Sequence, residues 1–466
     1  MVALRSRRLE SLLGAPIGEL TAADIRSLVT STTQEAFDLD FKLTLYGRGD
    51  SDKRALAGDV AALANTAGGV IVLGVGEDDH ARATSTPGVE LSDTEVARIR
   101  QVVASLVAPM PVFDVLTLPD ASQSQATSGI GDSPGPAHGF VLIAVPRSPQ
   151  APHAVLVNDA LRYPRRNGAT TRYLSEPEVA TAYRDRVARA GQLSERVKEV
   201  ERDAVARLDT TDGPWVVVSL VPDLAGDLVI NRDAYLAFQR QVVNKRPTVV
   251  DTGLSTTRAR VASRRLLADG TTDNSPHARW VLLELHADGS GVCGLRVGDL
   301  AERHRSQQPP TDGEPRQQLI DDESIAVAIL SGLLNLAQHA RDRAAAGGNA
   351  LVRAQVVPVS EDRPTHVGHT RGFGLAESRS TFVLTTAPPP AEAAAPLDDL
   401  VESGPALVAT AALLLDQVGH AFGVAEMGQL SHGGQLRQPY WGTTWRTQIS
   451  AWAEQHGIEV TDEKLP

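Results

Sequence analysis

The stretch from Glu35 to Asp79 constrains the fold of this chain more than any other, because its periodicity changes twice. Apolar side chains alternate over 36–45, which is the period of a half-buried strand. Ser51 can cap a helix that runs to Thr66, and a Gly-Gly pair then turns the chain into an apolar strand over 70–75. A strand, a helix and a second strand in this order predict a mixed α/β arrangement.

Acidic residues stand at the ends of both predicted strands. Asp40 and Lys42 share the polar face of the first strand, and Glu77 and Asp78 follow the second. Acidic strand ends that meet can hold a divalent metal ion, and a nearby Lys can hold a phosphate. Simpler interpretations stay open: Lys42 can pair with Asp40, the polar face of the strand can point to solvent, and the acidic run can be a tight turn.

Composition indicates a folded, multidomain chain. Its 466 residues predict two to four domains, and 42% of them are hydrophobic. No run approaches the roughly 20 apolar residues that span a bilayer, and the first residues contain no apolar signal core. The single cysteine, Cys293, excludes a disulfide scaffold and a thiolate zinc cluster within one chain. We expect a cytoplasmic protein with no membrane contact.

Charge is unevenly distributed. The formal net charge is −12, yet residues 162–189 hold seven Arg against three acidic residues. A basic stripe on an acidic protein fits a phosphate-binding groove, and its alternative is a solvated helix face. Only five residues of the chain are Lys, and Lys42 and Lys53 both fall in the first stretch. These two are therefore stronger candidates for a role than surface lysines usually are.

The remaining pattern predicts two domains, 1–208 and 209–466, both with mixed strands and helices. In the first, a helix capped by Ser92, four strands over 112–163 and a helix from Pro177 to about Leu208 follow the opening stretch. A Ser-, Gly- and Pro-rich segment, 121–137, reads as a mobile loop. In the second, strands are expected at 215–221 and 280–285, helices at 321–345 and 406–422, and Pro-rich connectors at 307–316 and 387–396.

Several short motifs occur in the order and spacing of one known family. They are Glu35-x4-Asp40-Phe-Lys42, Ala-Asn-Thr-x-Gly-Gly at 64–69, Gly-Val-x-Glu-Asp at 74–78, and Arg-Arg-Asn-Gly-Ala-Thr-Thr-Arg at 165–172. Together they resemble the Schlafen AlbA-type domain over roughly residues 20–190. The resemblance does not extend into 210–466, whose type is not indicated.

The resemblance implies an AlbA-like fold and a metal-dependent ribonuclease site. Glu35, Asp40 and Glu77 would bind Mg²⁺ or Mn²⁺, with Asp78 as the neighbouring alternative to Glu77. Lys42 would neutralise the charge that develops on the phosphoryl oxygens. The RNA backbone would be contacted by four basic residues, Lys53, Arg165, Arg166 and Arg172.

Two positions depart from the family pattern. The family more often has Glu where Asp40 stands and Asp where Glu77 stands, so one side chain is a methylene shorter and the other a methylene longer. Our hypothesis is that a metal between them moves slightly and is still held. If the exchange breaks coordination, the domain binds RNA without cutting it.

The function expected from the resemblance is an endoribonuclease that cleaves tRNA or a similar structured RNA. A catalytic domain joined to a large acidic partner suggests regulation, as in a phage-defence effector released by a phage-derived trigger, and a homodimer would complete the groove. The rival is a non-catalytic DNA- or RNA-binding transcriptional regulator, which needs the arginines but not the carboxylates. A third interpretation is a protein-interaction module without affinity for nucleic acid.

Two features of the second half have bland interpretations that we favour. His366 and His369 stand three apart in a Gly-rich segment, and exposed loop histidines are expected there rather than metal ligands. Trp441, Trp445 and Trp452 fall in the last 26 residues. We expect them to pack the core of a C-terminal helix, with a partner surface as the alternative.

Overall fold

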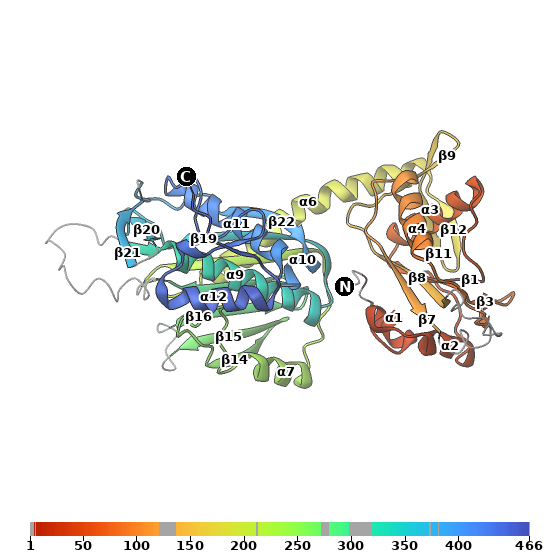
Figure 1. The fold of residues 1–466 in the computed structure, drawn as a ribbon, viewed down its shortest axis with the longest axis horizontal. Coiled ribbons are helices and arrows are strands. Elements are labelled where there is room, and N and C mark those ends of the chain that lie inside the picture. The colour runs from red at the N-terminus through yellow and green to blue at the C-terminus, as the bar shows by residue number, and fades with distance from the viewer. Residues whose placement is uncertain are drawn as a thin grey trace. The chain divides into compact units, whose positions relative to one another are not determined.

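The computed structural model describes residue 4 and residues 6–120, 137–210, 213–271, 279–297, 318–371, 374–380 and 382–465. Two compact units are present, Met1–Gly191 and Gln192–Pro466, and the division falls inside helix α6 (Glu176–Val205) (Figure 1). The sequence placed the boundary at the end of this helix, between 208 and 209. The predicted loop at 121–137, except for its last residue, and the predicted connector at 307–316 lie outside the described residues.

The first unit is a three-layer α/β structure, as predicted. Its elements are α1 (Arg7–Leu13), η1 (Ile17–Glu19), α2 (Ala22–Thr30), β1 (Leu39–Lys42), α3 (Asp50–Ala64), β2 (Gly68–Leu73), β3 (Gly76–Glu77), β4 (Ala83–Ser85), β5 (Val89–Glu90), α4 (Asp93–Leu106), β6 (Val107–Ala108), β7 (Asp114–Pro119), β8 (His138–Pro146), β9 (Ala154–Val157), β10 (Ala160–Arg162), β11 (Pro164–Asn167), β12 (Thr170–Tyr173) and the first part of α6.

One sheet of five strands organises the first unit. β1 runs parallel to β2 with α3 as the crossover, and β8 pairs antiparallel with β2, β5 and β7. Alternate residues of β2 enter different cores: Val70 and Val72 pack with α1 and α2, while Ile71 and Leu73 pack with α3 and α4. Both faces of the sheet are therefore covered, which explains the uninterrupted apolar run of β2.

Close backbone contact requires the Gly68–Gly69 pair. Gly68 has a φ of +77°. A Cβ on Gly69 would lie 2.4 Å from the backbone oxygen of Asp38. Any larger side chain would push β2 away from the start of β1, so the pair keeps the two parallel strands in register.

The second unit contains the remaining elements. They are the second part of α6, β13 (Trp215–Leu224), α7 (Arg232–Val242), β14 (Arg258–Ala262), β15 (Arg265–Thr271), β16 (Arg279–His286), β17 (Gly291–Arg296), β18 (Gln318–Asp321), α9 (Asp322–Gln338), the π-helical turn η3 (His339–Arg343), β19 (Gly347–Val357), β20 (Thr365–Arg371), β21 (Gly374–Arg379), β22 (Ala391–Pro396), α10 (Leu397–Val401), α11 (Pro405–Ala421), β23 (Leu436–Arg437), η4 (Gln438–Tyr440), α12 (Thr443–Gln455) and β24 (Val460–Thr461).

An antiparallel sheet of seven strands, in the order β14-β15-β16-β17-β13-β19-β22, forms the centre of the second unit (Figure 1). Helices α9, α10, α11 and α12 contribute to the large core on one face. On the other face, Val200 and Ala204 of α6 pack against Trp215 and Val217 of β13. The Pro-rich segment 387–396 was predicted as an extended linker, and this was wrong for its second half: β22 pairs with β19 as an edge strand, where proline is tolerated.

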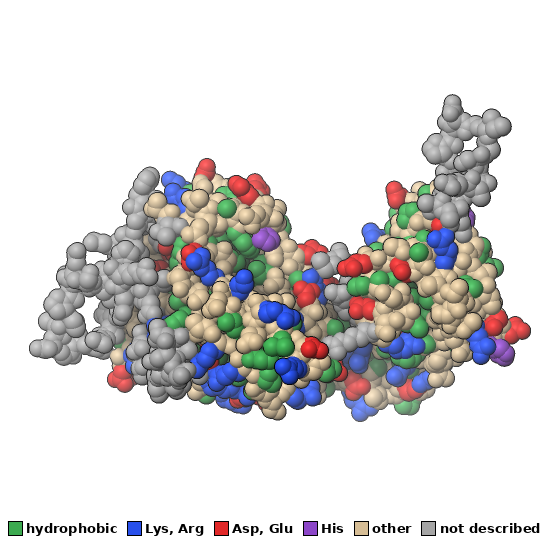
Figure 2. Space-filling view, turned by 90° about the horizontal axis from the view of Figure 1, so that it is seen from below, with side chains coloured by type: hydrophobic (Ala, Val, Ile, Leu, Met, Phe, Trp, Pro, Cys, Tyr) green, Lys and Arg blue, Asp and Glu red, His purple; other side chains and the backbone are tan. Residues whose placement is uncertain are grey.

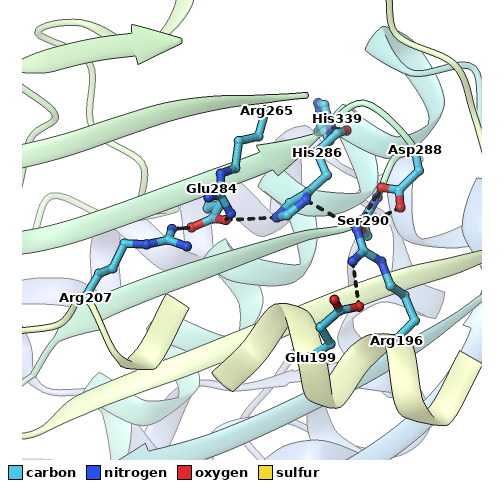
Figure 3. A network of polar contacts seen from close by, with 9 residues as sticks. All are labelled: Arg196, Glu199, Arg207, Arg265, Glu284, His286, Asp288, Ser290 and His339. Atoms are coloured by element: carbon cyan, nitrogen blue, oxygen red, sulfur yellow. Dashed lines mark hydrogen bonds and ion pairs between the residues drawn. The ribbon is translucent and has the colours of Figure 1, made fainter. Parts of the chain in front are cut away.

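Ion pairs fasten α6 and the residues after it to this sheet (Figure 3). Arg196 bonds Asp288 at 3.0 Å, and Arg207 and Arg265 both bond the buried carboxylate of Glu284. His286 Nε2 lies 3.0 Å from the same carboxylate. Burial opposes the charge on Glu284, but His286 and the two arginines together lower its pKa. These contacts add a polar attachment to the apolar packing of α6.

The C-terminal tryptophans are buried, as expected for core residues. Trp441 is fully buried but lies before α12, so it does not share a helical face with Trp445. The two histidines are not in an exposed loop, which corrects the prediction: both are half-buried residues of strand β20, and His369 Nδ1 lies 3.5 Å from Asp322. None of the helices in the described parts of the chain is long and apolar enough to cross a membrane.

Candidate nucleic-acid site

Asp40 is the centre of a buried charge cluster in the first unit. It lies on β1, an edge strand, and its side chain faces α3 because its neighbours Leu39 and Phe41 enter the opposite core. Its two oxygens bind different cations: Lys42 Nζ at 2.6 Å and Arg166 Nη1 at 3.0 Å. The Asp40 and Arg166 side chains are each only 3% exposed. The predicted polar face of the strand is thus covered, and the Asp40–Lys42 pair forms.

Arg166 is a buried residue that stabilises the first unit. It comes from β11, on which Pro164 and Arg166 are buried while Arg165 and Asn167 are exposed. Its backbone N–H donates to Thr66 Oγ1 at 3.0 Å, and its guanidinium also reaches the Ala36 carbonyl at 3.3 Å. An arginine held in this way cannot contact an RNA backbone, so the predicted role of Arg166 is replaced by a role in neutralising Asp40.

Glu35 lies at the open side of the cluster and is half-buried. Its carboxylate accepts a hydrogen bond from the Phe41 N–H at 2.5 Å. Burial raises the pKa of Glu35 to about 7 despite that bond, and the charges of Asp40 and Glu77 add to the rise. Burial opposes the charge on Lys42, but Asp40 raises the Lys42 pKa, so this ammonium stays charged. The site therefore offers a carboxyl that titrates near neutral pH beside a permanent cation.

Asp59 and Tyr46 belong to the cluster, and the sequence did not single them out. Tyr46 donates its hydroxyl hydrogen to Asp59 at 2.7 Å. Burial raises the pKa of Asp59, and the charge of Asp40 raises it further. The signal for Asp59 was present in the sequence, since it is an acidic residue on the packing side of helix α3.

Glu77 and Asp78 have different surroundings from the buried cluster. Glu77 ends β3, is exposed and is near enough to Glu35 to influence its titration. Asp78 accepts hydrogen bonds from the backbone N–H groups of His80 and Arg82, both at 2.9 Å, and these bonds lower its pKa. Asp78 therefore forms the turn that was weighed against a catalytic role.

Of the other predicted RNA contacts, Arg165 and Arg172 are exposed and Lys53 is half-buried. Lys53 pairs with Asp50 one helical turn away at 3.0 Å, and Arg172 pairs with Glu178 at 2.7 Å. Arg165 lines a pocket of about 300 Å³ at the start of α6, together with Glu178 and Asp185. Asn65 lines the same pocket and holds its wall, because its amide bonds the backbone of His153 and Pro164. The arginines are thus gathered near α6, on elements separate from the strand that carries Asp40.

The three predicted metal ligands do not form a cation site in this arrangement. Both oxygens of Asp40 are already bound by Lys42 and Arg166, so neither is directed to a metal ion shared with Glu35 and Glu77. Among the described residues, no group of three or more His, Cys, Asp or Glu side chains is placed to hold a metal ion. The donor set does not fit the predicted Mg²⁺ or Mn²⁺ site.

Residues 35–175 match the family model described as Schlafen, AlbA_2. The segment is similar to Schlafen AlbA_2 domains, and for that match we call residues 35–175 the AlbA_2 domain. The match begins at Glu35 and ends at Ser175, so it contains the charge cluster and the basic residues Lys53, Arg165 and Arg172. It confirms the resemblance found in the sequence motifs and supports a nucleic-acid-related function for the AlbA_2 domain.

Similar solved structures add little to this. The crystal structure of the DIP2311 protein from Corynebacterium diphtheriae is 21% identical, with a TM-score of 0.23, and the alignment covers 38% of this chain and 29% of that one. The solution structure of the N-terminal domain of a RecG-related protein from Nitrosomonas europaea is 17% identical, with a TM-score of 0.22, and covers 34% of this chain and 95% of that one. This chain spans under a third of the DIP2311 structure, and both TM-scores are too low to support a functional argument. No curated protein matches the sequence significantly.

Proposed function

We propose that the AlbA_2 domain is an endoribonuclease that acts at the Glu35–Lys42 side of its charge cluster. The observation that carries the proposal is a half-buried carboxyl, Glu35, whose pKa is raised to about 7, close enough to the charged Lys42 ammonium for each to influence the pKa of the other. A proton acceptor with a pKa near neutral is matched to general acid–base work, and an adjacent cation stabilises charge on a phosphoryl group.

The chemistry follows from the atoms that these two residues leave available. Lys42 Nζ donates to Asp40 and to the Phe41 carbonyl, and its third hydrogen is left for a phosphate oxygen. Glu35 would take the proton of the attacking hydroxyl group as the new phosphorus–oxygen bond forms. The resulting carboxylic acid would return that proton to the oxygen that leaves. No step is routed through a metal ion, because the donor set does not fit one.

The exposed arginines would hold the substrate. Arg165 and Arg172 lie on β11 and β12, which pair with each other, and Tyr173 next to Arg172 is 54% exposed. The guanidinium of Arg162 lies over the Tyr173 ring, 5.7 Å from its centroid. Exposed guanidinium groups and an aromatic ring on neighbouring strands suit a phosphate backbone with an accessible base. We propose tRNA or a similar structured RNA as the substrate class, on the family resemblance. A role in phage defence, a trigger read by the second unit and a homodimer belong to the same proposal.

A second candidate is a non-catalytic nucleic-acid-binding regulator. The saturation of Asp40 by Lys42 and Arg166 favours it, since both carboxylate oxygens are bound by cations and neither is left for a metal ion or a substrate. This candidate keeps Arg165 and Arg172 as backbone contacts and gives Glu35 no chemical role.

Incubation of the whole protein with total tRNA separates the two candidates. Wild type, Glu35→Gln and Asp78→Asn are compared with Mg²⁺, with Mn²⁺ and with a chelator, and the products are resolved on a denaturing gel. We expect discrete fragments from wild type and from Asp78→Asn, and intact tRNA from Glu35→Gln. Intact tRNA in every lane with measurable binding would favour the regulator, and cleavage that disappears with the chelator would restore the metal-dependent mechanism.

A further inference from the structure

The second unit carries a basic surface of its own. Residues 231–271 contain eight Lys and Arg against three Asp, in a chain whose net charge is −12. Four of the eight cations pair with carboxylates: Arg246 with Asp251, Arg258 and Arg260 with the buried Asp269, and Arg265 with Glu284. The other four are Arg232, Arg240, Lys245 and Arg264. Figure 2, which views the molecule from below, shows basic side chains gathered over the part of the second unit where α7 and β14 lie.

Helix α7 and the edge strand β14 form one continuous support for these cations. The Tyr235 hydroxyl on α7 donates to the Ala259 carbonyl on β14 at 3.1 Å. After α7 the chain is tied to the start of the strand, because the Thr256 N–H donates to the Lys245 carbonyl at 3.1 Å. Lys245 is thereby placed near one end of β14, and Arg264 occupies the turn at the other end. A strand of five residues is about 17 Å long.

The cations on this support fall into two groups. Arg258 and Arg260 share the carboxylate of Asp269, at 3.1 and 2.6 Å, which fixes their stems along the strand. Arg240, Lys245 and Arg264 are exposed, and in the described part of the chain their side chains have no ion-pair partner. Arg232, the first residue of α7, is exposed as well. We call the six residues Arg232, Arg240, Lys245, Arg258, Arg260 and Arg264 the α7–β14 surface.

We propose that the α7–β14 surface binds the phosphate backbone of a nucleic acid. The cations along β14 extend over about 17 Å, which corresponds to roughly five phosphates of one nucleic-acid strand at a rise of 3.4 Å per nucleotide. Along β14 the exposed large apolar side chain is that of Val261, at 51%. Binding to a membrane surface needs a wider apolar face that inserts between the lipids, so this surface suits a nucleic acid better. The choice of nucleic acid among polyanions rests on the function proposed for the AlbA_2 domain.

The test measures binding of the whole protein to a fluorescent RNA hairpin between 50 and 300 mM KCl. Arg240→Gln/Lys245→Gln removes two unpaired cations of the α7–β14 surface. Arg202→Gln/Lys464→Gln is the matched control, because it removes one Arg and one Lys that are also exposed and lie in other parts of the second unit. Arg165→Gln/Arg172→Gln weakens the proposed contacts of the AlbA_2 domain. Tryptophan emission checks the fold of the two second-unit variants, since all five tryptophans lie in that unit, and far-UV circular dichroism checks the fold of Arg165→Gln/Arg172→Gln.

The slope of log K against log salt falls by about 0.7 to 0.9 for each lost phosphate contact. We expect the slope of Arg240→Gln/Lys245→Gln to shrink by about 1.4 to 1.8 and that of the control to stay at the wild-type value. Equal slopes for these two variants would overturn the inference. That result would leave the proposed function standing if Arg165→Gln/Arg172→Gln still weakens binding.

The converse result is also informative. A reduced slope for the α7–β14 variant together with no effect of Arg165→Gln/Arg172→Gln would support the surface and count against the RNA contacts proposed in the AlbA_2 domain. Anionic phosphatidylserine vesicles form a second arm. Binding that depends on Arg240 and Lys245 for vesicles but not for RNA would overturn the inference in favour of a membrane surface.

Discussion

Replacing Arg166 by Met should destabilise the first unit specifically. The substitution keeps much of the apolar volume of the side chain but removes a guanidinium that is 3% exposed and bonded to Asp40 at 3.0 Å. Breaking a buried ion pair by removing one partner costs about 3–5 kcal/mol, because a charge is left without compensation. Lys42 remains on the second oxygen of Asp40, so we expect the lower end, about 3 kcal/mol.

Hydrogen exchange of the whole protein is the assay, read on backbone amides of β1 and β2. A loss of about 3 kcal/mol corresponds to a roughly 150-fold faster exchange for amides that exchange through unfolding of the unit. Arg165→Met is the matched control, since Arg165 is the preceding residue of the same strand and is exposed. Tryptophan emission during urea unfolding should remain unchanged, because all five tryptophans belong to the second unit.

The reasoning fails if Arg166→Met and Arg165→Met exchange at the same rate. A further comparison separates the charge from the packing. In Asp40→Asn/Arg166→Met the buried carboxylate charge is removed together with the guanidinium, and the charge left without its partner is that of Lys42, which is half-buried, so we expect the double variant to recover part of the loss. A double variant that is destabilised by the sum of the two single changes would mean that the residues do not interact.

Three further outcomes follow from other features. The pKa of Glu35 is raised to about 7, so the native state loses stability as pH rises from about 4.5 to 7. Glu35→Gln should therefore gain stability relative to wild type over that window, measured by urea unfolding at pH 5 and 8. An equal change in unfolding free energy between the two pH values for both proteins would contradict this. Gly69→Ala should destabilise the first unit by about 1–3 kcal/mol through its clash with the backbone of Asp38. Gly58→Ala, in the middle of α3 with open space around it, should instead stabilise the unit by up to about 1 kcal/mol. Hydrogen exchange measures both changes. The pKa of Glu284 is lowered, so this carboxylate stabilises the protein above its ordinary pKa of 4.5, and that stability is lost as pH falls. Acid unfolding of Glu284→Gln, monitored by tryptophan emission, should therefore depend less on pH than that of wild type. An unchanged acid transition would refute the role of this ion-pair network.

The fold of the first unit could be predicted from the sequence because its signals are local. The apolar run of β2, the Gly-Gly turn before it and the Ser92 cap each act within a few residues, and Ser92 does accept the Glu95 N–H. The predicted cap of α3 was wrong, since Gly49 precedes its first helical residue and Ser51 lies inside the helix. Helix ends shift easily by one or two residues when neighbouring polar side chains can serve equally well.

The candidate site was harder to predict because it depends on which elements pack over the polar face of β1. The period of β1 places Asp40 opposite the apolar face, but nothing in that period indicates that α3 packs over it. Arg165 and Arg166 appear equivalent in a basic run, and only their alternation along β11 sends one outward and the other inward. Once the segment is known to be a strand, one of two consecutive arginines must face the domain, and this deduction was available from the sequence.

The edge strand β22 shows that amino-acid composition alone does not predict every strand. Pro-rich sequence with many alanines reads as a linker, and its conversion into a strand comes from the free edge of β19, which is more than 30 residues away in the sequence. Backbone hydrogen bonds to such an edge need few specific side chains. Sequence patterns therefore carry little information about strands of this kind.

The shared helix α6 has a consequence for synthesis of the protein on the ribosome. The strands and helices of the first unit are all made before residue 191, so that unit can complete its core while the second unit is still absent. At that moment the second part of α6 exposes Val197 and Val200, because the strands that bury Val200 have not yet emerged. A nascent chain paused between the two units would present an apolar stripe of helix, which is the kind of surface that chaperones bind and that aggregation begins from.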